Sequence, residues 1–438
     1  MKIAWFTPFS EKSAIGKYSK LATDAISKFA AIDIFISDKE NLLKTTMKTI
    51  HYTVSESLLN RLSEYDIIVY NIGDNPVFHE CIYDVLQIKK GIIIIHDASL
   101  MGFFYGYYHN CKNNSDAFNA LYEKLYNESA NYATSRYLSS DGIKYGFMEE
   151  ITKFCSGIIV HSDFHSSVVN NVYNGPLTRI YFPFSQEYIS NSSSEDKPIK
   201  DASKINLLTV GNINKNKRVY EVVRAIGRSD ILKNALHYNI IGSKGDKDYI
   251  KQIEDVIDKY DMSDIIKIIG YVDDDTLAAY YRDADVLCNL RNPALEGASW
   301  SLVEQMSLGK PIIVSDNGFY SEIPDDCVFK VSTEHEEEEL NATLSLISEN
   351  YDLIKQKGRN AKKLVELQFS QEQYAKAFMS FAEQIIYGKP LEALINKLSF
   401  VMNQVGITQE MRIVDTLSEQ MELMFSKEKM TNRLEKYK

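Results

Sequence analysis

Short runs of mostly apolar, often β-branched residues recur along this chain, and longer stretches with helical periodicity separate them. The first series of such runs lies at residues 2–6, 32–36, 67–70, 92–95, 156–160 and 179–182. These runs do not alternate between apolar and polar residues, which indicates strands that are covered on both faces, as in a parallel sheet. A helical pattern at 13–29 follows the first run. The chain is therefore predicted to be an α/β protein with doubly wound parallel sheets.

The alternation is interrupted at 190–203, where Ser, Asp and Lys replace the apolar residues, and it then starts again. The second series of expected strands lies at 205–210, 238–241, 265–269, 286–289, 311–314 and 328–331. Because such sheets bind ligands at the carboxyl ends of their strands, we expect two Rossmann-like domains facing a central cleft. The predicted limits are 1–187 and 204–365 for the two domains, 188–203 for a linker, 366–388 for a helix that returns to the N-terminal domain, and 389–438 for a helical extension.

The composition excludes several classes of protein. Of 438 residues, 45% are hydrophobic and 25% are charged, which is typical of a globular chain. The net charge of −11 argues against a partner such as nucleic acid, whose binding needs cationic side chains. No apolar run approaches the roughly 20 residues that span a bilayer, and the apolar core of a signal peptide is not apparent. Five scattered cysteines fit reduced thiols, so we expect a cytoplasmic protein.

The stretch 290–324, LRNPALEGASWSLVEQMSLGKPIIVSDNGFYSEIP, carries the strongest functional signal. A strand is expected to end near Asn289 and a helix to begin at 299–301. The residues between them include Gly297, Ala298 and Ser299, whose small size lets backbone N–H groups approach a ligand. A helix N-terminus has unpaired N–H groups and the positive end of the helix dipole, so this junction is predicted to bind phosphate.

Two glutamates flank the junction. Glu296 precedes the helix, where its carboxylate can face a sugar or an oxocarbenium-like centre. Glu304 lies one turn into the helix, from where it can reach vicinal hydroxyls, as acids do for ribose in dinucleotide sites. A nucleotide diphosphate sugar requires this order of groups: an acid for the sugar, backbone N–H groups for the diphosphate and an acid for the ribose.

The two acids are separated by seven residues and are followed by LGKPIIVSD at 308–316. This block resembles the signature of the retaining glycosyltransferases of family 4, and the resemblance implies the GT-B fold over about residues 1–385. VGNI at 210–213, with Lys217 and Arg218, resembles the first strand and phosphate-binding loop of the donor domain, although the family often has Arg where this chain has Asn212.

Further segments resemble other parts of the family pattern. IIG at 240–242 and IGYV at 269–272 resemble the two strand ends that flank the base. In the N-terminal half, IGKYS at 15–19 resembles the glycine loop near the reaction centre, with Ala14 where a second glycine is common. His96-Asp97 and VHSDF at 160–164 also fit the pattern.

The resemblance implies a set of site residues. Catalytic roles fall to Glu296, His96 and Lys217. Donor-binding roles fall to Gly16, Gly211, Asn212, Lys217, Arg218, Gly242, Tyr271, Val272, Gly297, Ala298, Ser299, Ser301, Leu302 and Glu304. Acceptor-binding roles fall to Asp97 and His161. We expect no cofactor and no metal, because no Asp-X-Asp motif of the metal-holding kind is apparent and positive groups at the leaving diphosphate replace the ion.

The expected function is a retaining, metal-independent transfer of a hexose from a GDP- or UDP-sugar to a hydroxyl of a glycan or glycolipid. Bacterial surface polysaccharide synthesis, with contact at the inner membrane, is the setting that the resemblance implies. The sequence leaves open whether Glu296 is a nucleophile or a stabiliser. Two alternatives also stay open: a GT-B sugar-nucleotide epimerase, and a non-catalytic partner subunit that binds a second transferase through 391–438. Apolar residues at helical spacing in the extension are compatible with homo- or hetero-oligomers.

Overall fold

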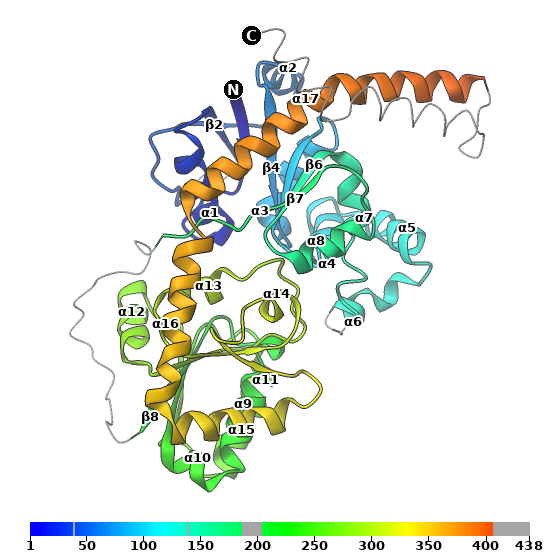
Figure 1. Ribbon diagram of the computed structural model, residues 1–438. Helices are drawn as coiled ribbons and strands as arrows, with labels where there is room; N and C mark the ends of the chain where they lie inside the picture. The colour runs from blue at the N-terminus through cyan, green and yellow to red at the C-terminus, as the bar shows by residue number, and fades with distance from the viewer. Residues whose placement is uncertain (38–39, 138, 140, 186–203, 406–438) are drawn as a thin grey trace. The chain divides into compact units, whose positions relative to one another are not determined.

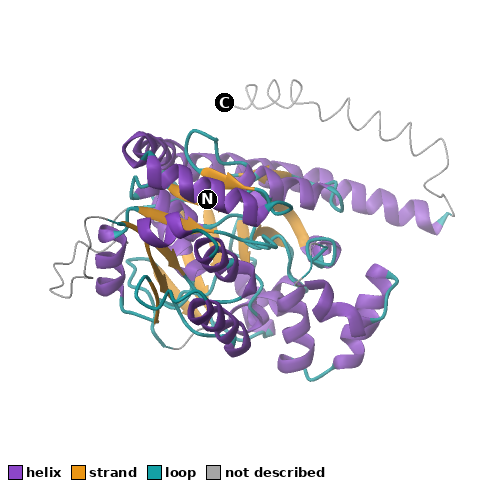
Figure 2. Ribbon diagram, turned by 90° about the horizontal axis from the view of Figure 1, so that it is seen from below, coloured by secondary structure: helices purple, strands orange, loops and turns teal. Residues whose placement is uncertain are grey.

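A computed structural model describes residues 1–438 except 38–39, 138, 140, 186–203 and 406–438 (Figure 1). The predicted linker at 188–203 and much of the predicted extension lie outside the described residues. The chain divides into two compact units, Met1–Ala382 and Glu383–Lys438. Both sheets belong to the first unit, in which helices enclose the strands (Figure 2).

The first sheet of the described chain has seven parallel strands in the order β3-β2-β1-β4-β5-β6-β7. Its strands are β1 (Lys2–Phe6), β2 (Ala31–Ile36), β3 (Lys48–His51), β4 (Ile67–Ile72), β5 (Gly91–Ile95), β6 (Cys155–Val160) and β7 (Leu177–Arg179). Its helices are α1 (Ala14–Ile26), α2 (Glu56–Leu62), α3 (Pro76–Leu86), α4 (Met101–Gly106), α5 (Ser115–Tyr126), α6 (Ala133–Tyr137), α7 (Met148–Ile151) and α8 (Asp163–Asn170).

The apolar runs do not predict β3, and they place the last strand of this sheet at 179–182, two to three residues later than β7 lies. β3 lies at the sheet edge, and only Ile50 of its four residues is buried. An edge strand with one buried residue has no apolar run to reveal it. The central strands β4 and β5 are buried throughout, which is the pattern that the apolar runs predicted.

The second sheet has six parallel strands among the described residues, in the order β10-β9-β8-β11-β12-β13. They are β8 (Ile205–Val210), β9 (Leu236–Ile241), β10 (Ile266–Gly270), β11 (Val286–Asn289), β12 (Ile312–Ser315) and β13 (Phe329–Val331). The helices are α9 (Val219–Gly227), α10 (Asp230–Ala235), α11 (Lys247–Lys259), α12 (Asp274–Asp283), α13 (Trp300–Ser307), α14 (Gly318–Ser321), α15 (Glu336–Glu349) and α16 (Tyr351–Gln368). The predicted class, α/β with two Rossmann-like sheets, is confirmed.

Strand order reverses once in each sheet, between β1 and β4 in the first and between β8 and β11 in the second. At such a switch point the connections leave in opposite directions, and a crevice opens at the carboxyl ends of the two strands. The topology therefore directs attention to the loops that follow these strands.

The helix α17 (Gln371–Gln404) follows the second sheet in sequence and packs, in its first turns, against the first sheet. The ring of Phe378 lies 5.6 Å from that of Trp5 in β1. The hydroxyl of Tyr374 forms a short hydrogen bond with that of Tyr18 in α1. The first turns of α17 thus pack against β1 and α1, which lie at the beginning of the same unit.

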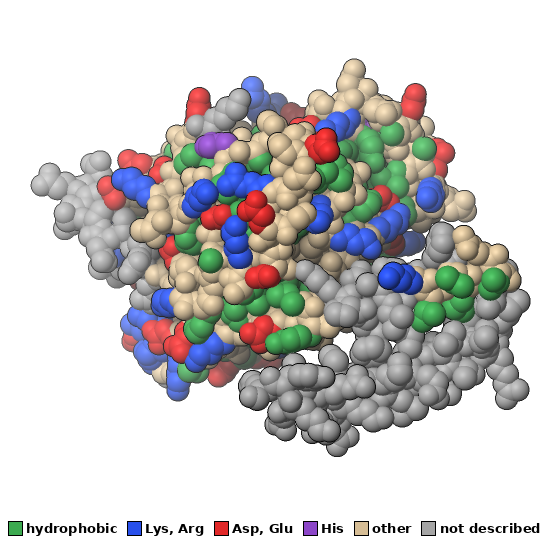
Figure 3. Space-filling model, turned by 90° about the horizontal axis from the view of Figure 1, so that it is seen from above, with side chains coloured by type: hydrophobic (Ala, Val, Ile, Leu, Met, Phe, Trp, Pro, Cys, Tyr) green, Lys and Arg blue, Asp and Glu red, His purple; other side chains and the backbone are tan. Residues whose placement is uncertain are grey.

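The face of the molecule shown in Figure 3 has Lys and Arg side chains interspersed with Asp and Glu side chains. Within the described ranges, no helix combines the length and the apolar character needed to cross a membrane.

Candidate active site

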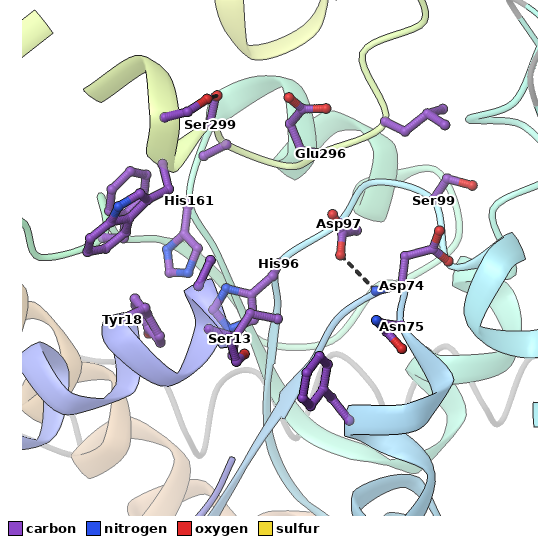
Figure 4. A pocket seen from close by; sticks show the side chains of 18 of the residues that line it. Ser13, Tyr18, Asp74, Asn75, His96, Asp97, Ser99, His161, Glu296 and Ser299 are labelled. Carbon is purple, nitrogen blue, oxygen red and sulfur yellow. Dashed lines mark hydrogen bonds between the residues drawn. The ribbon is translucent and has the colours of Figure 1, made fainter. Parts of the chain in front are cut away.

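The loops at the carboxyl ends of the strands line a cavity of about 650 Å³ in the first unit. The first sheet contributes loops and helix starts that follow β1, β4, β5 and β6. The second sheet contributes the 295–301 segment, which follows β11. Figure 4 shows Ser299 and Glu296 from this segment opposite Ser13, Tyr18 and His96 from the first sheet. The structure therefore brings together residues that the sequence places in two separate domains.

Backbone hydrogen bonds attach the 295–297 segment to the end of β5. The N–H of Ala98 donates to the carbonyl of Leu295 at 2.8 Å, and the N–H of Gly297 donates to the carbonyl of His96 at 2.9 Å. Asp97 and Glu296 form an isolated antiparallel bridge. The two predicted catalytic residues His96 and Glu296 are thus held next to each other by the main chain.

The N-terminus of α13 opens onto this cavity. Ser299 is its N-cap, and the Ser299 side chain accepts a hydrogen bond from the N–H of Leu302 at 3.3 Å. Among the described residues, the backbone N–H groups of Ala298, Ser299 and Ser301 have no hydrogen-bond acceptor, and all three residues line the cavity. Unpaired N–H groups at the positive end of a helix dipole form a binding site for an anion.

Two residues predicted for this cradle do not offer a free amide. The N–H of Gly297 is bonded to His96, and a Cβ at Gly297 would lie 2.0 Å from Nδ1 of His165, so glycine is required there for packing. The N–H of Leu302 is capped by Ser299, and the Leu302 side chain is fully buried. The unpaired amides therefore begin at Ala298, one residue after Gly297.

The Glu296 carboxylate is held by two side chains that the sequence analysis did not single out. The hydroxyl of Tyr320 donates to Oε1 of Glu296 at 2.6 Å, and Nε of Arg291 lies 3.2 Å from the same oxygen. Burial alone raises the pKa of this carboxyl, but Arg291 and Tyr320 outweigh it, and the pKa lies below its ordinary value. Arg291 could have been found from sequence, because it lies two residues after the carboxyl end of β11, as Asp97 lies two residues after that of β5.

Lys217 and Arg218 have different environments. Nζ of Lys217 donates to the carbonyl of Val210 at 3.2 Å, and burial together with the nearby Arg291 lowers the pKa of this ammonium well below its ordinary value. Lys217 does not itself line the cavity, although the preceding Asn216 does. Such a suppressed charge would be restored by a bound anion.

Arg218 does not approach the cavity. Its guanidinium forms ion pairs with Glu336 at the start of α15 and with Glu221 in α9, the latter at 2.8 Å. A guanidinium that already neutralises two carboxylates has little capacity for a third anion. The predicted role of Arg218 at the diphosphate is not supported by this geometry, and Arg291 is the arginine that the structure places beside Glu296.

The predicted strand-end residues of the second sheet lie outside the cavity. Gly211 and Gly242 have positive φ values of 125° and 152°, and a Cβ at Gly242 would lie 1.9 Å from the carbonyl oxygen of Gly211. The two glycines therefore allow two strand ends to approach closely. Asn212 accepts a hydrogen bond from Ser243 at 2.9 Å. Tyr271 is 82% exposed and, like the adjacent Val272, lines neither cavity described here.

Gly16 has a packing role in the structure. It lies in the first turn of α1, and a Cβ there would lie 2.7 Å from the carbonyl oxygen of Ser10 and 2.8 Å from that of Pro8. Gly16 does not line the cavity, whereas its neighbours Ala14 and Ile15 do. The predicted glycine loop reaches the site, but through residues other than its glycine.

A second cavity, of about 300 Å³, contains Glu304. Lys17 and Tyr281 also line it, and the hydroxyl of Tyr281 lies 3.5 Å from Oε2 of Glu304. Burial raises the pKa of the Glu304 carboxyl, although Lys17 opposes this effect. Trp300 lines both cavities, so the N-terminus of α13 lies between Glu296 on one side and Glu304 on the other.

Three histidines line the first cavity, His79 and the two predicted residues His96 and His161, and a fourth, His165, is buried next to Gly297. Burial lowers the pKa of His79 to about 4, of His161 to about 4, and of His165 to about 3, and it lowers the pKa of His96 well below its ordinary value. Asn71 holds two of them: its carbonyl contacts Nδ1 of His79 at 3.0 Å, and its Oδ1 contacts Nε2 of His96 at 3.1 Å. These side chains are therefore neutral hydrogen-bonding groups near pH 7.

The carboxyl of Asp97 lies in the same cavity beside a second acid, Asp74, which sequence analysis did not identify. Burial raises the pKa of Asp97 to about 7, and burial together with Asp97 raises the pKa of Asp74 to about 8. Asp74 follows β4 at the switch point, a position that could have indicated it. In the part of the chain that the structure describes, no three potential metal ligands converge; the expectation of a metal-independent reaction stays a prediction.

Comparisons with known proteins agree with this architecture. Residues 191–364 match the family model of Glycosyl transferases group 1. Sucrose-phosphate synthase from Thermosynechococcus elongatus is similar in structure, with a TM-score of 0.60 and 15% identity over 89% of this chain and 100% of that one. Anabaena HepE, solved with UDP and glucose, has a TM-score of 0.59 and 13% identity over 88% of this chain and 100% of that one.

WaaG, a glycosyltransferase involved in lipopolysaccharide biosynthesis, has a TM-score of 0.55 and 15% identity over 88% of this chain and 99% of that one. At these identities the likeness establishes the GT-B fold. No curated protein sequence matches the chain significantly.

The buried histidines make the stability of the protein sensitive to acid. In the unfolded chain they bind protons near pH 6.5, whereas His165 in the folded protein does so only near pH 3. Its contribution to the free energy of unfolding is complete above pH 6.5 and is lost as the pH falls towards 3. Replacing His165 with Gln should make the slope of this free energy against pH shallower by about 1.4 kcal/mol per pH unit.

Urea unfolding at several values between pH 4.5 and 6.5 measures this slope. The raised carboxyls Asp74 and Asp97 act with the opposite sign, but they do so in both proteins, so the difference between slopes isolates His165. The exposed His51→Gln variant controls for the substitution itself. An unchanged slope in His165→Gln would contradict the account of a buried, neutral ring.

Proposed function

We propose that this chain is a glycosyltransferase that moves a hexose from a nucleotide diphosphate sugar to an acceptor hydroxyl with retention of configuration. The observation that carries the proposal is the set of unpaired N–H groups of Ala298, Ser299 and Ser301, which open beside an ionised Glu296. The match of residues 191–364 to Glycosyl transferases group 1 supports it. The UDP and glucose in the HepE structure are of the proposed ligand class.

The diphosphate is proposed to bind at the N-terminus of α13. The three amides and the Ser299 and Ser301 hydroxyls supply donors, and Lys217 supplies charge from the neighbouring loop. Glu304, in the second cavity, accepts hydrogen bonds from the ribose hydroxyls. The nucleotide then crosses from one cavity to the other along Trp300, which lines both. The sugar lies in the larger cavity, between Glu296 and His96.

The reaction breaks the bond from the anomeric carbon to the diphosphate oxygen and forms one from that carbon to the acceptor oxygen. The acceptor approaches from the face that the diphosphate leaves, and a phosphate oxygen takes the acceptor proton. Developing negative charge on the diphosphate is stabilised by the amides of α13 and by Lys217, and preorganised donors of this kind contribute strongly to catalysis. Glu296 stabilises positive charge on the sugar, because Tyr320 and Arg291 keep it ionised and oriented.

Residues of the first sheet are proposed to orient the two sugars. His96 is neutral and is held by Asn71, so it offers hydrogen bonds without adding charge. Asp97 and His161 are proposed to contact the acceptor. Synthesis of a bacterial surface polysaccharide or glycolipid, in the cytoplasm near the inner membrane, is the proposed setting.

Removing the Lys217 ammonium should weaken nucleotide binding. Charge-assisted hydrogen bonds contribute about 1.5–3 kcal/mol, so Lys217→Met should raise the dissociation constant for UDP or GDP by about 10- to 100-fold, measured by calorimetry. The matched control is Lys215→Met, an exposed lysine of the same short helix, which should bind as the unsubstituted protein does. Equal affinity in Lys217→Met and the control would place the diphosphate elsewhere, and no binding of any nucleotide diphosphate to the unsubstituted protein would reject the proposed function.

Neutralising Glu296 should affect turnover more than binding. Glu296→Gln keeps the size of the side chain but removes the charge that stabilises the sugar cation. We expect hydrolysis of a bound donor, such as UDP-glucose or GDP-mannose, to slow by about 100-fold or more, as for other lost electrostatic groups, while affinity for the nucleotide changes little. Release of free sugar measures the rate, and the exposed Glu334→Gln variant is the control. A rate near that of the control would remove Glu296 from catalysis.

A further inference from the structure

One side of the larger cavity, away from α13, has its own set of polar and aromatic side chains. We call it the acidic chamber; it consists of Asp74, Asn75, Phe78, Asp97, Ser99 and Tyr137. In Figure 4, Asp74, Asn75, Asp97 and Ser99 lie together on one side of His96, whereas His161 and Ser299 lie on the other. The proposed diphosphate and donor sugar occupy the side of Ser299, so the acidic chamber is the space left for the acceptor.

The two carboxyls of the chamber are rigidly placed. Oδ1 of Asp74 accepts from the N–H of Phe103 and Oδ2 from the hydroxyl of Tyr137, each at 2.7 Å. Oδ2 of Asp97 accepts from the N–H of Asp74 at 2.7 Å. Within the described residues, Oδ1 of Asp97 accepts no hydrogen bond. It is therefore available to a hydroxyl or amino group of a ligand.

The charges that line the cavity favour ligands without negative groups. Three carboxyls line it, those of Asp74, Asp97 and Glu296, against one ammonium, that of Lys12. Lys12 also lines the second cavity, so it lies on the donor side. The histidines are neutral near pH 7, for the reason given above. The carboxyls of Asp74 and Asp97 keep at least one proton between them near pH 7, and the negative charge that remains faces no cation on this side of the cavity. A phosphate or carboxylate in the acidic chamber would meet that charge without a cation to offset it, which is costly in a desolvated site.

We propose, on the basis of the function proposed above, that the acidic chamber binds the acceptor as an uncharged or amino-bearing sugar unit and excludes sugars that carry phosphate or carboxylate there. Hydroxyl or amino groups of this unit donate to Asp97, and a ring face packs against Phe78 or Tyr137. The raised pKa values of Asp74 and Asp97 support this, because a carboxyl pair that keeps a proton near neutrality both accepts and donates hydrogen bonds. Charge on the chamber wall thus selects the acceptor.

Saturation-transfer NMR with four probes tests the proposal: methyl glucoside, glucosamine, glucose 6-phosphate and glucuronate, each added to the full-length protein with UDP. The neutral and amino probes should bind, and the two anionic probes should not. Asp97→Asn should weaken binding of methyl glucoside by about tenfold. At about pH 9, above both raised pKa values, Asp97→Asn and Asp74→Asn should each remove one negative charge and so reduce the exclusion of glucuronate. The exposed Asp116→Asn variant, in α5, is the matched control and should behave as the unsubstituted protein does.

Preference of the unsubstituted protein for the anionic probes, or absence of any signal from the neutral probes, would overturn the proposal. Unchanged selectivity in both Asp97→Asn and Asp74→Asn would do the same. Calorimetry with UDP separates this failure from that of the proposed function. If the protein binds UDP but prefers the anionic probes, only the proposal for the acidic chamber is rejected. If the protein does not bind UDP, the proposed donor site is rejected. Thermal unfolding of each variant shows whether it is folded, and Asp74→Asn provides the second test if Asp97→Asn is not.

Discussion

The site depends on a short stretch of backbone that hydrogen-bonds across from one sheet to the other. The carbonyl of Leu295 and the N–H of Gly297 are both bonded to the chain at 96–98, so the residue between them, Glu296, is fixed against the end of β5. The hydroxyl of Ser162, after β6, also donates to the carbonyl of Gly297. With these main-chain groups satisfied by the first sheet, the amides of Ala298, Ser299 and Ser301, around the start of α13, are left without an acceptor among the described residues.

The charged side chains around this backbone are separated by sign: a cation lies beside Glu296, and the carboxyls of the acidic chamber lie on the other side of the cavity. The histidines are buried and neutral, and they shape the cavity without attracting an anion to the wrong side. Positive charge is held close to Glu296 by Arg291, and the carboxyls of Asp74 and Asp97 lie together in the acidic chamber. Within the proposed function, this separation keeps the diphosphate at α13 and leaves the opposite side to an uncharged acceptor.

The fold could be predicted from sequence because mostly apolar runs of four to six residues alternate regularly with longer helical patterns, as in doubly wound parallel sheets. The strand β3 could not be predicted, because its single buried residue, Ile50, does not form an apolar run. The phosphate-binding junction could be predicted from sequence, because the helix start, the N-cap Ser299 and the small residues lie next to each other along the chain. The pairing of the Gly297 N–H could not be predicted, since the carbonyl that accepts from it belongs to His96, about two hundred residues away along the chain. Tyr320 could not be predicted for the same reason, because only tertiary structure brings it to Glu296.

The central claim is that the amides of Ala298, Ser299 and Ser301 are unpaired in the free protein and bind a diphosphate. Amide hydrogen exchange, followed residue by residue with and without saturating UDP, tests it most directly. The account predicts rapid exchange at these three positions in the free protein and slowing by about tenfold or more with UDP, while Gly297 is already protected. Slow exchange at these positions before UDP is added, or rates that UDP leaves unchanged, would contradict it.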